Sequence, residues 1–402
     1  MMPEIQKQKS DWILILGQLL AQLSDRMTGL GLIWMVTEQF GEKWVTWYLV
    51  MGGIPHILLS AWTGKTIQMF GALRVVVYAD WLRAAIYLIA IISISQVTLV
   101  QELVFVMGLV FLSNLFAAFF NPAILSVPLE LEEGSQVQKL TARLSSVSSL
   151  AVVIGPILGM FAFQQFGLRG LFILNCISYS VSALCAWSLR SRIKTISSKN
   201  SEADSSIGLF ETLSENSLVA VMLFVFLLMN LLLSPIQVQL PYLAKNVFEG
   251  SFNSLAILEI AFGGGVLVGG LILSWYSIQK KTLLHAYFYL IGLCLGFLGL
   301  QFSHLLWSAS VSLVGMGIFI GLANILIINI FQNQPHPSHV PNIMSMVNSI
   351  SAAAVPFALI VVGGFQTITT IDRISLYSAN ILLFVCILSY IPFRKFGKDL
   401  MT

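Results

Sequence analysis

The sequence predicts an all-α membrane protein with twelve transmembrane helices in two six-helix repeats. Its 402 residues are 57% hydrophobic and only 10% charged, whereas a soluble globular protein has about 25% charged residues. Apolar segments near 20 residues in length recur along the chain, and about 20 residues are needed to cross a hydrocarbon core of about 30 Å. One polar stretch divides these segments into two sets of six, which suggests two bundles.

The N-terminal bundle is predicted over residues 1–189, and each span ends at charges or turn residues. Its spans are expected at residues 12–37, 44–64, 75–96, 99–121, 141–164 and 169–189. The first span follows a polar start without a signal-peptide cleavage site, so we expect it to be retained. Residues 190–217 are rich in Ser, Lys and Glu and predict a solvated connector.

The C-terminal bundle is predicted over residues 218–402. Its spans are expected at residues 218–243, 254–276, 282–302, 305–331, 342–366 and 374–393. A short internal similarity supports a repeat, because NPAILSVP at 121–128 matches QPHPSHVP at 334–341 with an offset of 213 residues. Transporters are often built from such repeats.

The distribution of basic residues predicts the orientation in a cell (inner) membrane. Of 21 Lys and Arg residues, 15 lie on the side of the termini, four on the opposite side and two, Arg26 and Arg83, within spans. Because basic residues concentrate in cytoplasmic loops, both termini and the connector are expected in the cytoplasm.

Several other functions find no support in the sequence. No run of basic residues with interleaved aromatics suggests nucleic-acid binding. The phosphate-loop-like residues 64–66 lack the required glycine, because Leu59 stands in its place. His336 and His339 form an HxxH in a loop without a nearby carboxylate or cysteine, which is usually incidental. We therefore expect no enzyme activity, no cofactor and no metal.

Ionisable residues within spans are the first candidates for function, since each costs roughly 2.5–3.5 kcal/mol in hydrocarbon. Asp25 is the first candidate proton carrier and Glu259 the second. Adjacent helical positions diverge, so Asp25 and Arg26 cannot both face one cavity; alternatively, they neutralise each other or cap a kink. Glu259 is equally compatible with a water-exposed rim position.

Asp80 and Arg83 are three residues apart on one helix face, where they can pair. With Arg26 and Arg74, they are candidates for a buried charge or gate. Candidate cavity residues are the uncharged polar side chains Gln22, Asn121, Asn230, Gln237 and Asn324. Each of these could equally cross-link helices.

Glycine and proline residues mark expected bends and close helix approaches. The candidates are Gly155, Pro156, Gly159, Gly265, Gly269 and Pro356. Gly265 and Gly269 form a small-xxx-small face suited to tight crossing. Pro156 and Pro356 are expected to kink the fifth and eleventh spans.

Nearly the whole chain resembles the major facilitator superfamily, and within it the branch of macrolide-efflux and enterobactin exporters. LSDRMTGLGLIWMV at 23–36 resembles the first helix of that branch, with Asp25 on its acidic position. YADWLRA at 78–84 resembles the start of its third helix. FFNPAILSVP, GPILG and SPIQVQLPYLAKNVFEGS resemble its fourth, fifth and seventh helices, the last followed by the Gly-rich cluster of helix eight.

One segment departs from the family pattern. The superfamily's signature loop between helices two and three carries an Asp–Arg pair, but Gln68 and Met69 occupy these places here. Arg74 is the only basic remnant. Because that charge network is thought to lock the cytoplasmic gate, the usual gating scheme is in doubt.

The resemblance implies a proton-driven exporter that works by alternating access. Its expected cargo is a small amphipathic molecule, such as a siderophore or a macrolide-like drug, its coupling ion is a proton, and it is expected to be a monomer in membrane lipid. Alternatives are an importer or lipid flippase of the same fold, and a receptor or scaffold without transport.

Overall fold

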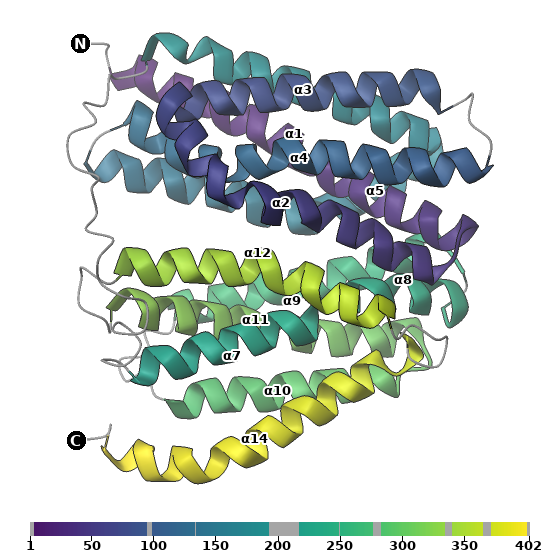
Figure 1. The fold of residues 1–402 in the computed structure, drawn as a ribbon, viewed down its shortest axis with the longest axis vertical. Helices are drawn as coiled ribbons and strands as arrows, with labels where there is room; N and C mark the ends of the chain where they lie inside the picture. The colour runs from purple at the N-terminus through teal and green to yellow at the C-terminus, as the bar shows by residue number, and fades with distance from the viewer. Residues whose placement is uncertain are drawn as a thin grey trace. The chain divides into compact units, whose positions relative to one another are not determined.

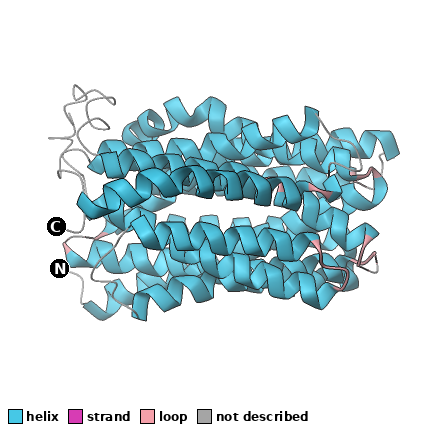
Figure 2. Ribbon diagram, turned by 90° about the horizontal axis from the view of Figure 1, so that it is seen from below, coloured by secondary structure: helices cyan, strands magenta, loops and turns pink. Residues whose placement is uncertain are grey.

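The computed structural model describes residues 4–94, 99–132, 134–192, 217–248, 250–275, 283–333, 340–364 and 371–399. Within these ranges the regular structure is helical and no strand occurs (Figure 2). The fold is therefore all-α, as predicted. The chain separates into two compact units, Met1–Lys199 and Asn200–Thr402. Most of the predicted connector and the HxxH histidines lie outside the described residues.

The first unit contains five long helices and one short 3₁₀ turn. They are α1 (Glu4–Gln39), α2 (Glu42–Phe70), α3 (Ala72–Ser93), α4 (Leu99–Leu131), α5 (Ser135–Ser188) and η1 (Arg190–Arg192), coloured purple to blue-green in Figure 1. Gly167 interrupts α5 with φ 59° and ψ −166°, a conformation that a side chain would strongly disfavour. The interruption divides α5 into two membrane-length helices, so this unit holds six spans.

The second unit contains seven described helices, coloured green to yellow in Figure 1. They are α7 (Ser217–Leu233), α8 (Ile236–Asn246), α9 (Phe252–Trp275), α10 (Leu283–Gln301), α11 (Leu306–Asn333), α12 (Val340–Gly364) and α14 (Ile374–Asp399). Pro235 separates α7 from α8 because proline cannot donate the backbone hydrogen bond that would continue the first helix. Taken as one broken span, α7 and α8 bring this unit to six as well.

Length and apolar composition alone give a lower number of spans. Six described helical segments satisfy both criteria, or seven if the two parts of α2, bent by 64°, count as one span. One of these segments, Gln136–Arg192, has 57 residues. At 1.5 Å per residue such a segment is more than twice the thickness of a hydrocarbon core of about 30 Å, so it must cross twice.

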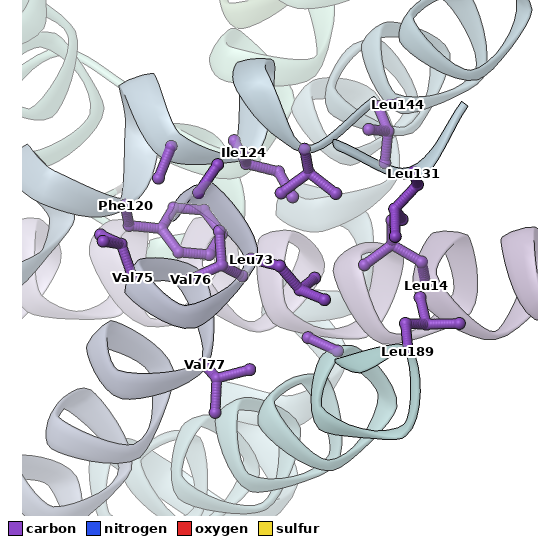
Figure 3. Packing of buried hydrophobic residues seen from close by; sticks show 14 of the residues in the cluster. Leu14, Leu73, Val75, Val76, Val77, Phe120, Ile124, Leu131, Leu144 and Leu189 are labelled. Atoms are coloured by element: carbon purple, nitrogen blue, oxygen red, sulfur yellow. The ribbon is translucent and has the colours of Figure 1, made fainter. Parts of the chain in front are cut away.

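The first unit has an apolar core where α1, α3, α4 and α5 meet. Leu14 of α1, Leu73 and Val76 of α3, Ile124 of α4 and Leu144 of α5 pack together there (Figure 3). The opposite face of α3 exposes large apolar side chains such as Ile89 and Ile92. Exposed apolar side chains of this kind suit a bilayer, where lipid covers the outward side of the helix.

Backbone-to-backbone packing joins α9 and α11 in the second unit. A β-carbon at Gly265 would lie 2.3 Å from the Val314 carbonyl oxygen, and one at Gly269 would lie 2.2 Å from that of Ile318. From α11, Gly317 and Gly321 approach α9 equally closely. Paired small-xxx-small faces of this kind allow tight crossing of transmembrane helices.

Candidate functional site

A buried ion pair lies at the centre of the first unit, on α3. Arg83 Nη2 donates a hydrogen bond to Asp80 Oδ1 at 2.5 Å. The two residues are one helical turn apart, so their side chains share a face. Both are almost completely buried, with exposed fractions of 2% for Arg83 and 0% for Asp80. A charge enclosed in this way must be paired, because its desolvation is costly.

A second carboxylate reaches the same guanidinium from α1. Arg83 Nη1 lies 3.5 Å from Asp25 Oδ2, and the Tyr179 hydroxyl of α5 donates a hydrogen bond to Asp25 Oδ1. Arg83 Nη1 also donates to the Tyr179 hydroxyl at 3.3 Å. The Asp25 side chain is 41% exposed, unlike Asp80. Asp25 is therefore the more accessible of the two acids in this cluster.

Hydrogen bonds from α5 and α1 hold Asp80 in place. The Ser182 hydroxyl donates to Asp80 Oδ2 at 2.7 Å, and Gln18 Nε2 donates to the Ser182 oxygen at 2.9 Å. A chain of polar contacts thus runs from Gln18 to Asp25 through α5 and α3. Each buried polar group in this series of contacts depends on the next. The contacts therefore fix α1, α3 and α5 in one register.

Two aromatic rings flank the guanidinium. The Arg83 Cζ atom lies 4.2 Å from the ring centroid of Phe120 and 4.2 Å from that of Tyr179. Such cation–π contacts strengthen when the cation is shielded from water. Tyr87 stacks against Tyr179, with ring centroids 5.8 Å apart. Two carboxylates and two rings therefore surround one permanent positive charge.

Glu130, near the end of α4, joins that helix to the start of α3. Its two carboxylate oxygens accept hydrogen bonds from the backbone N–H groups of Ala72, at 2.5 Å, and Leu73, at 3.0 Å. These N–H groups begin α3 and have no partner within the helix. Gly71 precedes them with φ 86°. Glu130 thus supplies an acidic contact beside the loop between α2 and α3, where Gln68 and Met69 replace the expected Asp–Arg pair.

An ion-pair network fixes the start of the connector. Arg192 of η1 binds Asp11 of α1, with Nη1 to Oδ1 at 3.0 Å, and also binds Glu132, just after α4. Arg143 lies 4.0 Å from Asp11 Oδ2. Burial raises the pKa of the Asp11 carboxyl, an effect that the hydrogen bond from Arg192 partly opposes. These contacts hold the beginning of the connector against the first unit.

Not every residue expected in a buried charge cluster is there. Arg26 and Arg74 are exposed. Arg26 points away from the cluster because adjacent helical positions diverge and Asp25 is the one turned toward α3. A buried position was therefore wrong for both arginines, whereas a role at a gate stays a prediction. Asp25 and Arg26 form no ion pair in the described structure. In the second unit Glu259 is half-buried and has an interaction within the chain.

The polar candidates occupy varied environments. Asn230 Nδ2 donates to the Phe226 carbonyl of its own helix at 2.8 Å. Asn121 and Gln237 are exposed, whereas Gln22 and Asn324 are half-buried. Gly155 and Gly159 pack against α1 at Arg26 and Met27. Pro156 lies within α5 and Pro356 within α12.

Several residues of the site were not predicted from the sequence. Asn175, Tyr179 and Ser182 lie at i, i+4 and i+7, a polar stripe that helical spacing could have revealed. Both side-chain polar atoms of the buried Asn175 lack a hydrogen-bond partner in the described structure. His56 was also missed, although it lies within the second predicted span. Its Nε2 atom is 3.3 Å from Asn114 Oδ1.

Metal ligands are not clustered in this site. Among the described residues, no group of three or more His, Cys, Asp or Glu side chains could hold a metal ion.

Comparison with known proteins gives matches over most of the chain. The family model described as Major Facilitator Superfamily matches residues 14–359. Macrolide efflux protein A of Streptococcus pyogenes is 21% identical over 383 residues, covering 92% of this chain and 93% of that protein. The protein of the same name from Enterococcus faecalis is 22% identical over 330 residues, covering 79% and 100%.

Solved structures agree with the chain in fold. A bacterial homologue of the human lysosomal transporter Spinster, in an inward-facing state, has a TM-score of 0.69 at 11% identity and covers 99% of both chains. A bacterial homologue of the iron transporter ferroportin, also inward-facing, has a TM-score of 0.69 at 14% identity, covering 94% of this chain and 98% of that one. At these identities the likeness concerns the fold alone.

Proposed function

The chain belongs to the major facilitator superfamily, and we propose that this multi-pass membrane transporter is a proton-coupled exporter of small amphipathic molecules. The observation that carries the proposal is the half-exposed Asp25 carboxylate, held in the middle of a span by Arg83 and Tyr179. Intramembrane acids of this kind are typical of proton pathways. Macrolide efflux proteins among the relatives support export as the direction of transport.

Protonation of Asp25 changes the charge balance of the cluster. When ionised, Asp25 and Asp80 together carry one more negative charge than Arg83 neutralises. A proton on Asp25 removes that excess and weakens its attraction to Arg83, while Asp80 still holds the guanidinium at 2.5 Å. Because Asp25 lies on α1 and Arg83 on α3, protonation alters a contact between two helices. This is how proton binding would favour one conformation over another in alternating access.

The proton gradient can supply the work of export. One charge moved through 100 mV is worth about 2.3 kcal/mol, which corresponds to a concentration ratio of roughly 50 for a neutral cargo. We propose a siderophore or a macrolide-like drug as the cargo. We also propose that both termini face the cytoplasm of the cell (inner) membrane, on the distribution of 15 basic residues against four.

Transport by the purified full chain in proteoliposomes tests this proposal. A 14-membered macrolide and a catecholate siderophore are the probes, and a trapped pH dye reports proton movement. We expect an imposed pH gradient to drive movement of at least one probe, with proton flux in the opposite direction, and an uncoupler to abolish it. Accumulation in the same direction as protons would indicate an importer. Binding without movement would indicate a receptor. Either of these two outcomes would refute the proposal of an exporter.

Reporter fusions test the orientation separately. Fusions at both termini and within residues 193–216 should all report a cytoplasmic location. A terminus on the outer face would contradict the proposed topology.

A further inference from the structure

Arg26 lies on the exposed face of α1. No described residue forms an ion pair or hydrogen bond with its guanidinium, and the side chain is exposed. Its neighbour Asp25 does not neutralise it, because Asp25 points in another direction and is bound to Arg83 and Tyr179. The charge of Arg26 is therefore available to a ligand.

The depth of Arg26 follows from the ion pair beside it. Helix α3 has 22 residues, Ala72–Ser93, and at 1.5 Å per residue it matches the thickness of the hydrocarbon core, about 30 Å. Arg83 stands eleven residues after Ala72 and ten before Ser93, at the middle of this helix. Asp25 contacts Arg83, so Arg26 lies at the same level. A guanidinium at this depth must face water or an anion rather than lipid.

The packing of α5 fixes the stem of Arg26 and leaves its head accessible. A β-carbon at Gly155 would lie 2.5 Å from Arg26 Cβ and 3.2 Å from its Cγ. One turn further along α5, a β-carbon at Gly159 would lie 3.2 Å from Met27 Cα. The two glycines therefore let the backbone of α5 contact α1 directly. A larger residue at position 155 would displace the arginine.

The side of α1 that carries Arg26 is mostly apolar toward the start of the helix. Leu19 and Leu23 lie on this side, within two turns of Arg26, and both are half-buried. Gln22, one turn away on the same side, is polar and also half-buried. An apolar face with one central cation suits a molecule with an apolar body and a single acidic group.

We propose that Arg26 binds the carboxylate of an amphipathic cargo. This inference rests on the proposed transport function and favours acidic amphiphiles over macrolide-like drugs as its substrate class. Arginine is the suitable residue, because its planar fork donates two parallel hydrogen bonds to a carboxylate and stays charged at every physiological pH. Asp25 then has a separate role, since its carboxylate faces α3 and α5 instead of the ligand.

Binding to pairs of probes that differ only in charge tests the proposal. The probes are fusidate and cholate, each compared with its methyl ester, and the protein is the full chain in an uncharged detergent without anionic lipid. We expect wild type to bind each acid about tenfold or more tightly than its ester, as for a hydrogen-bonded ion pair. R26Q should remove this difference while ester binding stays unchanged. R26K should retain part of it.

The controls separate this inference from the transport proposal. R169Q removes another exposed arginine of the first unit, at the start of the second half of α5, and should keep the full preference for acids. Thermal unfolding of each variant should match wild type. Equal binding of acid and ester by wild type, or an unchanged preference in R26Q, would overturn the inference even if proteoliposomes export the macrolide. Absence of any proton-driven export would instead refute the transport proposal. The acid-over-ester preference would still decide whether Arg26 binds a carboxylate.

Discussion

Arg83 Nη1 lies 3.5 Å from Asp25 Oδ2, and this contact joins a fully enclosed cation to a carboxylate that is 41% exposed. The same guanidinium holds the enclosed Asp80 at 2.5 Å. The arrangement gives the two acids different roles. Asp80 fixes Arg83, whereas Asp25 is the member of the cluster that solvent can reach.

Replacement of Asp25 by Asn should abolish proton-driven flux. The amide keeps the size of the side chain but cannot take up and release a proton. Flux is measured in proteoliposomes with a pH gradient, and thermal unfolding should show that the variant is folded. Glu at this position should retain partial flux. Undiminished gradient-driven flux in D25N would remove Asp25 from the proposed mechanism.

Separating the enclosed pair should destabilise the first unit strongly. Removal of one partner from a buried ion pair costs about 3–5 kcal/mol, because the other charge stays buried without its closest partner. We expect D80N and R83Q each to lower the unfolding temperature in detergent, and the double variant to lose less than the sum of the two. Additive losses would show that the pair is not coupled.

Loss of the Glu130 carboxylate should loosen the start of α3. E130A leaves the N–H groups of Ala72 and Leu73 without their acceptors, and loss of a helix cap costs about 0.5–2 kcal/mol. Hydrogen exchange at residues 72–75 should become faster. E102Q changes a glutamate near the other end of α4 and serves as the control. Unchanged protection in E130A would mean that another group caps α3.

Alanine at two glycines of α9, Gly264 and Gly269, should affect the stability of the protein differently. At Gly269 the added β-carbon would lie 2.2 Å from the Ile318 carbonyl oxygen, whereas at Gly264 it meets nothing within 4 Å. We expect G269A to destabilise by about 1–3 kcal/mol through overpacking. G264A should be neutral or stabilising by up to about 1 kcal/mol, from helix propensity. The measurement is thermal unfolding of both variants, and equal effects would contradict the tight crossing.

Much of the fold followed from local sequence. The all-α class was predicted correctly, because the length of an apolar segment is a local property. The break between the two halves of the 135–188 segment was also anticipated as two spans, since one helix of that length exceeds the bilayer. The spacing of Gly265 and Gly269 indicated a close crossing. It did not indicate that the partner helix would be α11, which contributes Gly317 and Gly321 to the contact.

The site was less accessible to sequence reasoning. Asp80 and Arg83 could be paired in advance because i, i+3 spacing places them on one face. Glu130 could not be connected with the missing Asp–Arg pair, because its contact crosses from α4 to α3, 57 and 58 positions away. Arg26 was expected among the buried charges, and only the packing of α5 on α1 showed that it is exposed.

By itself, the sequence determined that lipid is the solvent of this protein and how many times the chain crosses it. These properties depend on composition within short segments. Only the tertiary structure decided which intramembrane charges meet, because the rotation of each helix is set by the packing of its whole length. Asp25, Arg83 and Tyr179 are 58 to 154 positions apart, and no local pattern could specify that their side chains converge.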